Sequence, residues 1–359
     1  MHKIIYITYN LNTYSGAAYQ ALNLASHLQS DEEIVIFNFT KNQYCREGYV
    51  DRGVNVFDFN NSLLGLLRLL IKIIRYRIKV VHFHVFLTPV ILVFMFLRKR
   101  IIIKTTMISD DDFDSLLKKT KYRFLKRLIF RFLSKNICLS KHAMKINSHY
   151  IPIDKIVNIP NGVELPEEVK IEQKEVNSFC YVGVICERKQ TLEAIKYFHR
   201  NYSSLKDSIL YIIGPNKVSD NVPEFDNEYY YMCQKYIMEY ALNRQIIFVG
   251  KCSKDKLLPY YVKSKAFIFF SKKEGLPNVV LEAMSYNCVP IVSSMDGVAE
   301  EIIDVGYDGF ILTGSFKEII NEDEINSIIK SGNCFNKIKN RFSINTICSN
   351  YKELYSGLK

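Results

Sequence analysis

The stretch Glu274–Pro290, EGLPNVVLEAMSYNCVP, decides the fold of the second half of this chain. It follows Ala266–Ser271 (AFIFFS), a short apolar and aromatic run that is typical of a buried parallel strand. Gly275 and Pro277 interrupt that run, VVLEAM then has helical spacing, and VPIVS at 289–293 has the composition of the next strand. The order strand, loop, helix, strand predicts a parallel α/β unit.

Two glutamates, Glu274 and Glu282, flank this loop with seven residues between them. A helix that begins at the carboxyl end of a parallel strand directs backbone N–H groups and about half a positive charge at one point, where phosphate binds. With Asn278 in the first turn, Glu282 lies one turn further along the same face. Because carboxylates accept hydrogen bonds from vicinal hydroxyls, the spacing indicates a nucleotide-sugar site. The alternative is two solvated surface glutamates.

This segment resembles the E-x7-E signature of retaining glycosyltransferases of family 4, which have the GT-B fold. The resemblance implies that Glu274 is a catalytic-site residue that contacts the donor sugar and that Glu282 binds the nucleotide ribose. It also implies that the backbone amides of Asn278–Val279 hold the diphosphate. The family usually has a small residue and glycine where this chain has Asn287–Cys288, at the helix end away from the donor.

A second donor-side segment is YVGVICERKQT at 181–191, where a predicted strand ends at Gly183 and two cations follow. The resemblance implies that Lys189 neutralises the donor diphosphate, with Arg188 beside it. The family often has arginine directly after the glycine, where this chain has Val184, so we expect Arg188 to supply that charge. Without the resemblance, a Glu-Arg-Lys run is usually solvated.

The composition indicates a globular protein of two domains. The chain has 359 residues, of which 48% are hydrophobic and 24% are charged. Its nine cysteines form no C-x-x-C pair and are interpreted as reduced core thiols of a cytoplasmic protein. The first residues show no signal peptide. The apolar run 80–97 contains two histidines and a Thr-Pro, so a buried strand and helix are favoured over a membrane span.

Apolar strands and helical patterns alternate in both halves, which predicts parallel strands joined by crossover helices. In the first half they lie at 4–8, 17–28, 34–39, 63–74, 80–84, 89–97, 101–104, 116–133 and 136–139. In the second half they lie at 178–182, 191–198, 208–213, 229–241, 246–249, 254–261 and 266–271.

The turn-rich, acidic stretch 159–170 is interpreted as a linker between two doubly wound, Rossmann-like domains of an α/β GT-B fold that face a cleft. Residues 1–165 are expected to bind the acceptor, and residues 166–340 to bind the nucleotide-sugar. The resemblance implies that the last helix, within 341–359, crosses back onto the first domain.

Positive charge is concentrated in the first domain: residues 1–165 hold 24 of the 48 Lys and Arg but only 12 of the 37 Asp and Glu. Cations alternate with apolar residues in 68–79 (RLLIKIIRYRIK) and 118–135 (KKTKYRFLKRLIFRFLSK). Basic amphipathic helices bind anionic lipid, so we expect a peripheral location at the inner face of the plasma membrane. The alternative is two ordinary helices with basic polar faces; nucleic acid is not expected, because no recognised binding motif is present.

Two other features of the first half suggest cleft residues. In the loop 10–17 (NLNTYSGA), Gly16 allows close approach of a ligand to the backbone, or is part of an ordinary turn. The resemblance implies that this loop lines the donor diphosphate and the acceptor. His82 and His84 end a strand on one side of it, and the resemblance places such histidines at the cleft edge. A metal pair is the alternative, but no third ligand of suitable spacing follows.

After the next strand, KTTMISDDDF at 104–113 lacks the histidine that many family members have at Thr106 or Met107. It offers Asp110, Asp111 and Asp112 instead. These carboxylates either accept acceptor hydroxyls or act as a base, or they cap the following helix.

No nucleophile-plus-base constellation is evident. The resemblance implies that the acceptor attacks from the face that the diphosphate leaves and that the departing phosphate takes its proton, without a metal or cofactor. The protein then needs only to position the substrates and to stabilise the leaving diphosphate with cations. We therefore expect a retaining hexosyltransferase that moves a sugar from a UDP-sugar to a glycan, lipid-linked, in bacterial surface polysaccharide synthesis. The alternatives are a nucleotide-sugar epimerase of the same architecture and a transferase-like binding subunit.

Overall fold

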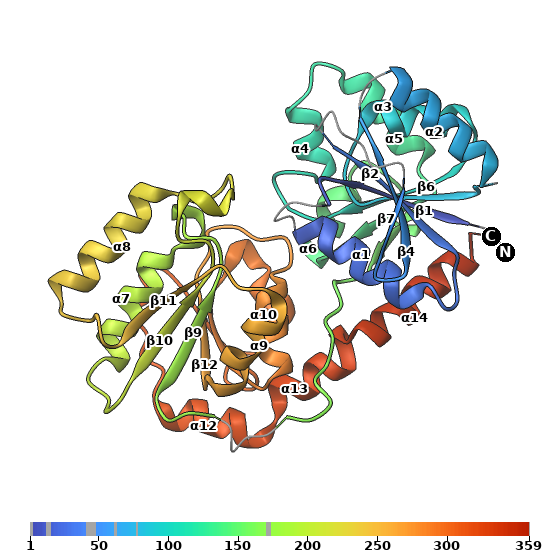
Figure 1. The fold of residues 1–359 in the computed structure, drawn as a ribbon. Coiled ribbons are helices and arrows are strands. Elements are labelled where there is room, and N and C mark those ends of the chain that lie inside the picture. Colours follow the sequence, from blue (N-terminus) through green and yellow to red (C-terminus); the bar gives the residue numbers. More distant parts are fainter. Residues whose placement is uncertain are drawn as a thin grey trace. The chain divides into compact units, whose positions relative to one another are not determined.

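The computed structural model of the chain describes residues 3–11, 16–40, 48–60, 63–76, 78–169 and 174–358. The chain forms two compact α/β units (Figure 1). Met1–Gly162 and Ile344–Lys359 make the first, and Val163–Ser343 makes the second. The first unit thus ends three residues before the expected boundary at 165, and the chain returns to it at 344 instead of 341.

Within its described residues, the first unit contains an eight-stranded sheet of order β3-β4-β2-β1-β5-β6-β7-β8. β3 runs antiparallel to β4, and the other neighbours are parallel. The strands are β1 (Ile4–Tyr9), β2 (Ile34–Phe39), β3 (Tyr49–Asp51), β4 (Val54–Phe59), β5 (Val80–Phe83), β6 (Arg100–Thr105), β7 (Lys135–Cys138) and β8 (Ile156–Asn158). The strand order reverses at β1, between β2 and β5, which is the switch point of a doubly wound sheet.

Helices cover both faces of this sheet (Figure 1). They are α1 (Gly16–Leu28), α2 (Leu63–Arg75), α3 (Thr88–Phe96), α4 (Phe113–Lys118), α5 (Arg123–Phe132), α6 (Lys141–Asn147), the 3₁₀ turn η1 (Ile153–Lys155) and α14 (Ile344–Ser356). α1 packs against α14 on one face, and α3 packs against α5. Tyr6 and Ile102 from the sheet and Tyr351 and Tyr355 from α14 share one buried cluster, so the chain's last helix closes the first unit's core.

The second basic segment is not the single helix that its spacing predicted. α4 ends at Lys118, α5 begins at Arg123, and the hydroxyl of Thr120 accepts a hydrogen bond from the backbone N–H of Tyr122 (3.1 Å). A threonine that bonds the backbone locally competes with the helical ladder, which explains the break. The first basic segment is helical only as far as Arg75, where α2 ends.

The second unit's described residues form a six-stranded parallel sheet of order β11-β10-β9-β12-β13-β14. The strands are β9 (Ser178–Val182), β10 (Ile209–Ile213), β11 (Ile246–Gly250), β12 (Ala266–Phe269), β13 (Val289–Ser293) and β14 (Phe310–Leu312). The strand order reverses between β9 and β12, so a crevice is expected at the carboxyl ends of these two strands.

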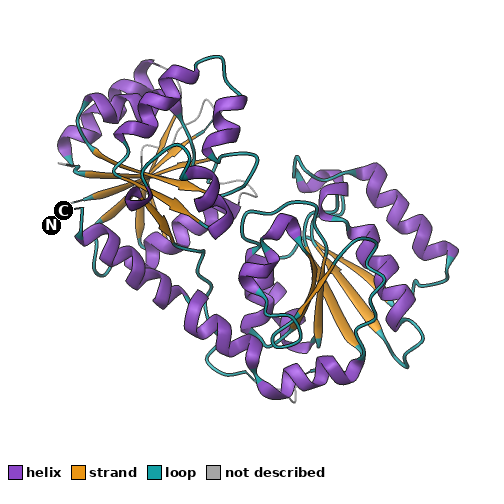
Figure 2. Cartoon of the chain, turned by 180° about the vertical axis from the view of Figure 1, so that it is seen from behind, coloured by secondary structure: helices purple, strands orange, loops and turns teal. Residues whose placement is uncertain are grey.

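Helices enclose this sheet as well, with α7 and α8 on one face and α9 and α10 on the other (Figures 1 and 2). The helices are α7 (Thr191–Tyr202), α8 (Asn227–Glu239), α9 (Lys254–Lys263), α10 (Asn278–Ser285), α11 (Ala299–Ile302), α12 (Glu322–Ser331) and α13 (Asn333–Lys337). Short 3₁₀ turns are η3 (Glu187–Lys189), η4 (Val218–Asp220) and η5 (Met295–Gly297), and η6 (Ile338–Phe342) is a π-helix. The predicted strand, loop, helix and strand around residues 274–290 are confirmed as β12, α10 and β13.

The end of α10 explains how the chain tolerates asparagine where the family usually has a small residue or glycine. Asn287 has a φ of 54°, the left-handed conformation that ends many helices and that asparagine adopts more readily than most residues. Its side-chain nitrogen donates to the carbonyl of Ile329 in α12 at 2.7 Å. Asn287 thus ends α10 and ties it to its neighbour.

The apolar run 80–97 forms β5 and α3, as predicted. In the described parts of the chain, every helix is too short or too polar to cross a bilayer. The cysteines in those parts are free thiols, and all but Cys252 are buried. Cys45 lies outside the described residues.

Candidate functional site

Three glycines end adjacent strands at the carboxyl edge of the second sheet. The N–H of Gly183 donates to the carbonyl of Ile213 (2.9 Å), and the N–H of Gly214 donates to that of Gly250 (3.0 Å). A Cβ on Gly214 would lie 1.8 Å from the carbonyl oxygen of Gly183, so no other residue fits there. Gly183 was predicted from the sequence, whereas Gly214 and Gly250 were missed, although Gly214 follows an apolar strand and Gly250 ends one.

Glu274 lies beside this edge, where it is only 7% exposed. Its Oε1 accepts hydrogen bonds from Lys189 Nζ (2.6 Å), Ser271 Oγ (2.6 Å) and Arg188 Nη1 (3.2 Å). The structure therefore brings the three predicted catalytic residues together. Ser271, two residues after the end of β12, was missed, and nothing in its local sequence marks it.

The backbone around the cluster is fixed by further hydrogen bonds. Ser271 N donates to Ser293 Oγ at the end of β13 (2.9 Å), and the Tyr181 hydroxyl donates to the carbonyl of Lys189 (3.0 Å). Arg188 also donates to the carbonyl of Lys273 (2.8 Å) and to Glu224 (2.6 Å). Groups held by several partners are preorganised, which is what charge stabilisation in a transition state requires.

The loop after Glu274 leads into α10, whose N-cap residue Pro277 provides no side-chain hydrogen bond. Asn278 and Val279 form the half-buried first turn. Such a helix terminus presents backbone N–H groups and a partial positive charge to an anion. Val184, which stands where the family often has arginine, is buried, so the cations beside Gly183 are those of η3.

Glu282 lies one turn into α10. Burial raises the pKa of its carboxyl to about 7, opposed by the nearby Lys254 and by the Tyr261 hydroxyl, which donates to Oε2 at 3.4 Å. An acceptor that is half-buried and only weakly hydrogen-bonded can bind ligand hydroxyls.

Among the predicted acceptor-side residues, His84 directly follows β5 and is 4% exposed. Its ring lies 4.1 Å from that of His82 and 4.7 Å from that of Tyr6, measured between centroids, and burial lowers its pKa well below the usual value. The alternation prediction is confirmed, because both histidines face the same side. They lie in the interior of the first unit.

Three consecutive aspartates have three different environments. Asp110 is exposed and pairs with Lys119 (2.5 Å). Asp111 accepts hydrogen bonds from Thr106 N (2.8 Å) and Met107 N (2.7 Å), and burial raises its pKa to about 6. Asp112 caps α4 by accepting from Ser115 N (2.9 Å). Of the two roles predicted for this cluster, helix capping falls to Asp112.

Gly16 begins α1, and a Cβ there would meet nothing within 4 Å among the described atoms. Residues 12–15 of its loop lie outside the described residues. The donor-binding role of Gly16 therefore stays a prediction. Over the part of the chain that the structure describes, no group of three or more His, Cys, Asp or Glu side chains could hold a metal.

The two parallel-sheet units have the GT-B architecture of glycosyltransferases. The fold resembles that of Anabaena HepE, crystallised in complex with UDP and glucose, with a TM-score of 0.73, 14% identity and coverage of 99% of this chain and 100% of that one. It also resembles the apo form of the lipopolysaccharide outer core galactosyltransferase WaaB, with a TM-score of 0.68, 18% identity and 99% coverage of both chains.

The chain itself identifies the family. Residues 165–346 match the model described as "Glycosyl transferases group 1", and residues 14–167 match that described as "Glycosyltransferase Family 4". The chain therefore belongs to the group 1 glycosyltransferases, and it is a glycosyltransferase of GT-B fold.

Two bacterial relatives are each 28% identical to this chain. One is an Escherichia coli enzyme named UDP-Gal:alpha-D-GlcNAc-diphosphoundecaprenol alpha-1,3-galactosyltransferase, matched over 66% of this chain and 64% of its own length. The other is the capsular polysaccharide biosynthesis glycosyltransferase CapH of Staphylococcus aureus, matched over 69% of this chain and 66% of its own. The match spans slightly less than two thirds of either relative.

Proposed function

We propose that this glycosyltransferase transfers a hexose from a UDP-sugar to a lipid-linked glycan with retention of anomeric configuration, in bacterial surface polysaccharide synthesis. The observation that carries the proposal is Glu274, held between Lys189 and Arg188 beside the uncapped start of α10. This arrangement combines a carboxylate for sugar hydroxyls with cations and amides for a diphosphate.

The names of related proteins support the donor and the acceptor. The Escherichia coli relative is named for UDP-galactose and for an acceptor on diphosphoundecaprenol. HepE was crystallised with UDP and glucose.

In the proposed reaction, the diphosphate binds at the first turn of α10, and Lys189 and Arg188 neutralise the charge that grows on it as the glycosidic bond breaks. Glu274 contacts the sugar, and Glu282 accepts from the ribose hydroxyls. The acceptor hydroxyl attacks from the face that the diphosphate leaves, and a departing phosphate oxygen takes its proton. The scheme needs positioning and cations, so we propose that no metal takes part.

The test is turnover of UDP-, GDP- and dTDP-hexoses with a bacterial lipid extract, with the product's anomeric centre assigned by NMR. We expect a UDP-sugar to be consumed and an α-linked product to form from an α-linked donor. A β-linked product would contradict retention. Epimerisation without acceptor would favour an epimerase, and binding without turnover would favour a binding subunit.

We also propose that the first unit docks on the anionic inner face of the plasma membrane. Apolar side chains stand exposed on α2 and α5 (Ile74 76%, Phe124 80%), next to Arg75, Arg123 and other cations of these helices. Apolar insertion and charge attraction then act together.

Liposome flotation tests this docking. Binding should increase with anionic lipid, weaken with salt, and fall in Phe124→Asp. Val176→Asp is the matched control, because Val176 is a similarly exposed apolar residue (70%) of the second unit. Equal flotation of the two variants would contradict the assignment.

A further inference from the structure

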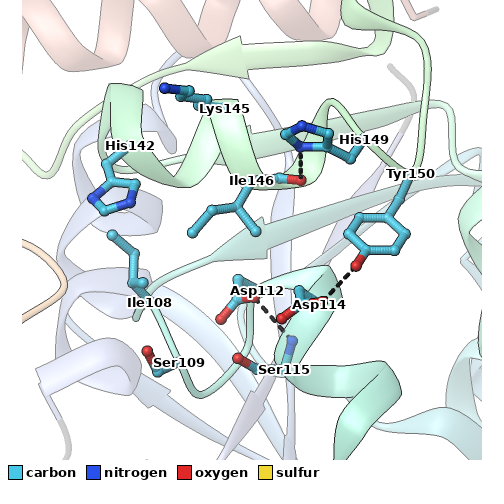
Figure 3. Close-up of a pocket in the computed structure, with 10 residues that line it drawn as sticks. All are labelled: Ile108, Ser109, Asp112, Asp114, Ser115, His142, Lys145, Ile146, His149 and Tyr150. Carbon is cyan, nitrogen blue, oxygen red and sulfur yellow. Dashed lines mark hydrogen bonds between the residues drawn. The ribbon is translucent and has the colours of Figure 1, made fainter.

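A pocket of about 510 Å³ lies wholly within the first unit, between the turn that leads into α4 and helix α6 (Figure 3). This volume is within the range of ligand sites, roughly 300–1,000 Å³. Of the residues that line it, Asp112 belongs to the aspartate cluster predicted to accept acceptor hydroxyls or to cap the helix. Glu274, Lys189 and Arg188 of the second unit do not line it.

A buried carboxylate oxygen of Asp112 indicates that the pocket is a ligand site. The residue lines the pocket and is 1% exposed. One carboxylate oxygen accepts the capping hydrogen bond from Ser115 N, whereas the buried Oδ2 has no partner among the described residues. A buried carboxylate oxygen without a partner is costly, and a ligand that donates a hydrogen bond would relieve that cost.

The neighbouring Asp114 has no carboxylate oxygen without a partner. Asp114 accepts from the Tyr150 hydroxyl (2.6 Å) and pairs with Lys118 (2.5 Å). Both of its oxygens are therefore engaged, and Asp112 is the acceptor that the pocket offers to a ligand.

The opposite wall carries positive charge and N–H donors. His142 and Lys145 are three residues apart on α6, and His149 lies just beyond the end of that helix. All three line the pocket (Figure 3). His149 Nδ1 is held by the carbonyl of Ile146 (3.2 Å), which directs Nε2 away from the backbone. A lysine ammonium and two imidazoles on one wall of a pocket suit an anion with several oxygens.

We infer that this pocket binds a glycosyl phosphate: sugar hydroxyls donate to Asp112 Oδ2, and the phosphate contacts Lys145 and the two imidazoles. The inference rests on the proposed function, because it makes the pocket the site for the phosphorylated sugar of the acceptor. A free sugar 1-phosphate and the sugar diphosphate of a lipid share this chemistry.

Binding is measured by calorimetry on the full chain with glucose 1-phosphate and N-acetylglucosamine 1-phosphate, and with glucose and inorganic phosphate separately. We expect a sugar phosphate to bind more tightly than either component. Asp112→Asn keeps the cap, because asparagine caps helices as well as aspartate does, but it places an N–H₂ group or a weaker acceptor at Oδ2. Asp112→Asn and Lys145→Met should each weaken binding about tenfold. Lys141→Met on the same helix, outside the pocket lining, should change it less than about twofold.

A second arm uses transfer kinetics with a short-chain prenyl diphosphate sugar. If the lipid-linked form is the ligand, both variants raise the acceptor KM with little change in kcat, whereas soluble sugar phosphates compete weakly. Hydrolysis of the donor without acceptor stays unchanged. Unaltered sugar phosphate affinity in a folded Asp112→Asn variant would overturn the inference, as would equal affinity for inorganic phosphate. The proposed function would survive either result, since donor turnover, transfer to the acceptor and the anomeric configuration of the product test it separately.

Discussion

At the scale of single residues, the cluster of Glu274, Lys189 and Arg188 combines an acid that is almost buried with two cations. The cost of burying these charges is met by mutual pairing and by the hydrogen bond from Ser271. Binding of a diphosphate gives Lys189 a second anionic partner, so its role is best tested by removing its charge alone.

We expect Lys189→Met to reduce hexose transfer about 100-fold or more, because one preorganised cation is lost from the leaving group. Lys272→Met is the control, since Lys272 forms an exposed ion pair with Glu187. Steady-state kinetics of both variants with the same donor provide the measurement. Equal rates for the two would remove Lys189 from the site.

At Glu282, protein stability and ligand binding are expected to depend on pH in opposite directions. Its carboxyl has a pKa of about 7 in the folded chain, above the ordinary value of 4.5, because burial penalises the ionised form. Between pH 4.5 and 7 the folded state therefore holds more protons than the unfolded state, and this residue's contribution to stability falls as pH rises through that window. Ligand hydroxyls, in contrast, are accepted best by the ionised form, which dominates above pH 7.

Nucleotide affinity should accordingly fall about tenfold between pH 8 and pH 6 if only the ionised carboxylate binds. Glu282→Gln should bind weakly with a flatter profile, and it should melt at a higher temperature than the wild type at pH 8. Calorimetric titration and thermal melts at both pH values test this. A wild-type affinity profile in the glutamine variant would exclude Glu282 as the titrating group.

At the scale of elements, one buried hydroxyl of α14 lies within hydrogen-bonding distance of two side chains of the first sheet. Tyr355 OH lies 2.7 Å from Tyr6 OH and 2.9 Å from His82 Nδ1, and all three residues are buried. A buried polar group costs most when its partner is removed and nothing replaces it.

Tyr355→Phe should therefore lower the free energy of unfolding of the first unit by about 1–3 kcal/mol, because it leaves two buried polar groups without their shared partner. Ser356→Ala removes only an exposed bond to the carbonyl of Glu353 and should change stability by less than about 0.5 kcal/mol. Denaturant unfolding of both variants distinguishes these values. A neutral Tyr355→Phe would mean that the hydroxyl network contributes no net stability.

At the scale of the whole molecule, the first unit is built from two distant parts of the chain. Ile347, Tyr351 and Tyr355 of α14 belong to the same buried cluster as Ile4 and Tyr6 of β1. The second unit is continuous in sequence and contains the whole cluster of Glu274, Lys189 and Arg188.

Deleting residues 344–359 should thus unfold or strongly destabilise the first unit while the second still binds nucleotide. Hydrogen exchange followed by mass spectrometry would report this as lost protection in β1 and β5 peptides and retained, nucleotide-dependent protection in β9 and β12 peptides. Unchanged protection in β1 would show that α14 is dispensable for that core.

Local signals carried most of the sequence prediction. Apolar runs, Gly275 and Pro277 placed the loop between β12 and α10, because strand composition and helix starts depend on neighbouring residues. Strands β3 and β4 were missed, although VNVFDF of β4 alternates as a strand does. β3 has only three residues and pairs antiparallel with β4, so no helix separates the two strands to complete the alternating pattern. The helix across 116–133 was also wrong, since the bond from Tyr122 to Thr120 overrides its periodicity.

The sequence by itself determined the family and the repetition of α/β elements, because these depend on motifs of fixed local spacing. It assigned Glu274 and Lys189 to one site only through the resemblance, and the contact between these two side chains, 85 residues apart, came from the tertiary structure. Only the tertiary structure decided what each polar side chain does. Asp110, Asp111 and Asp112 are identical residues in a row, and they differ because Lys119, Thr106 and Ser115 approach them from different directions. Partners of that kind are set by how the chain folds around a position, and composition does not specify them.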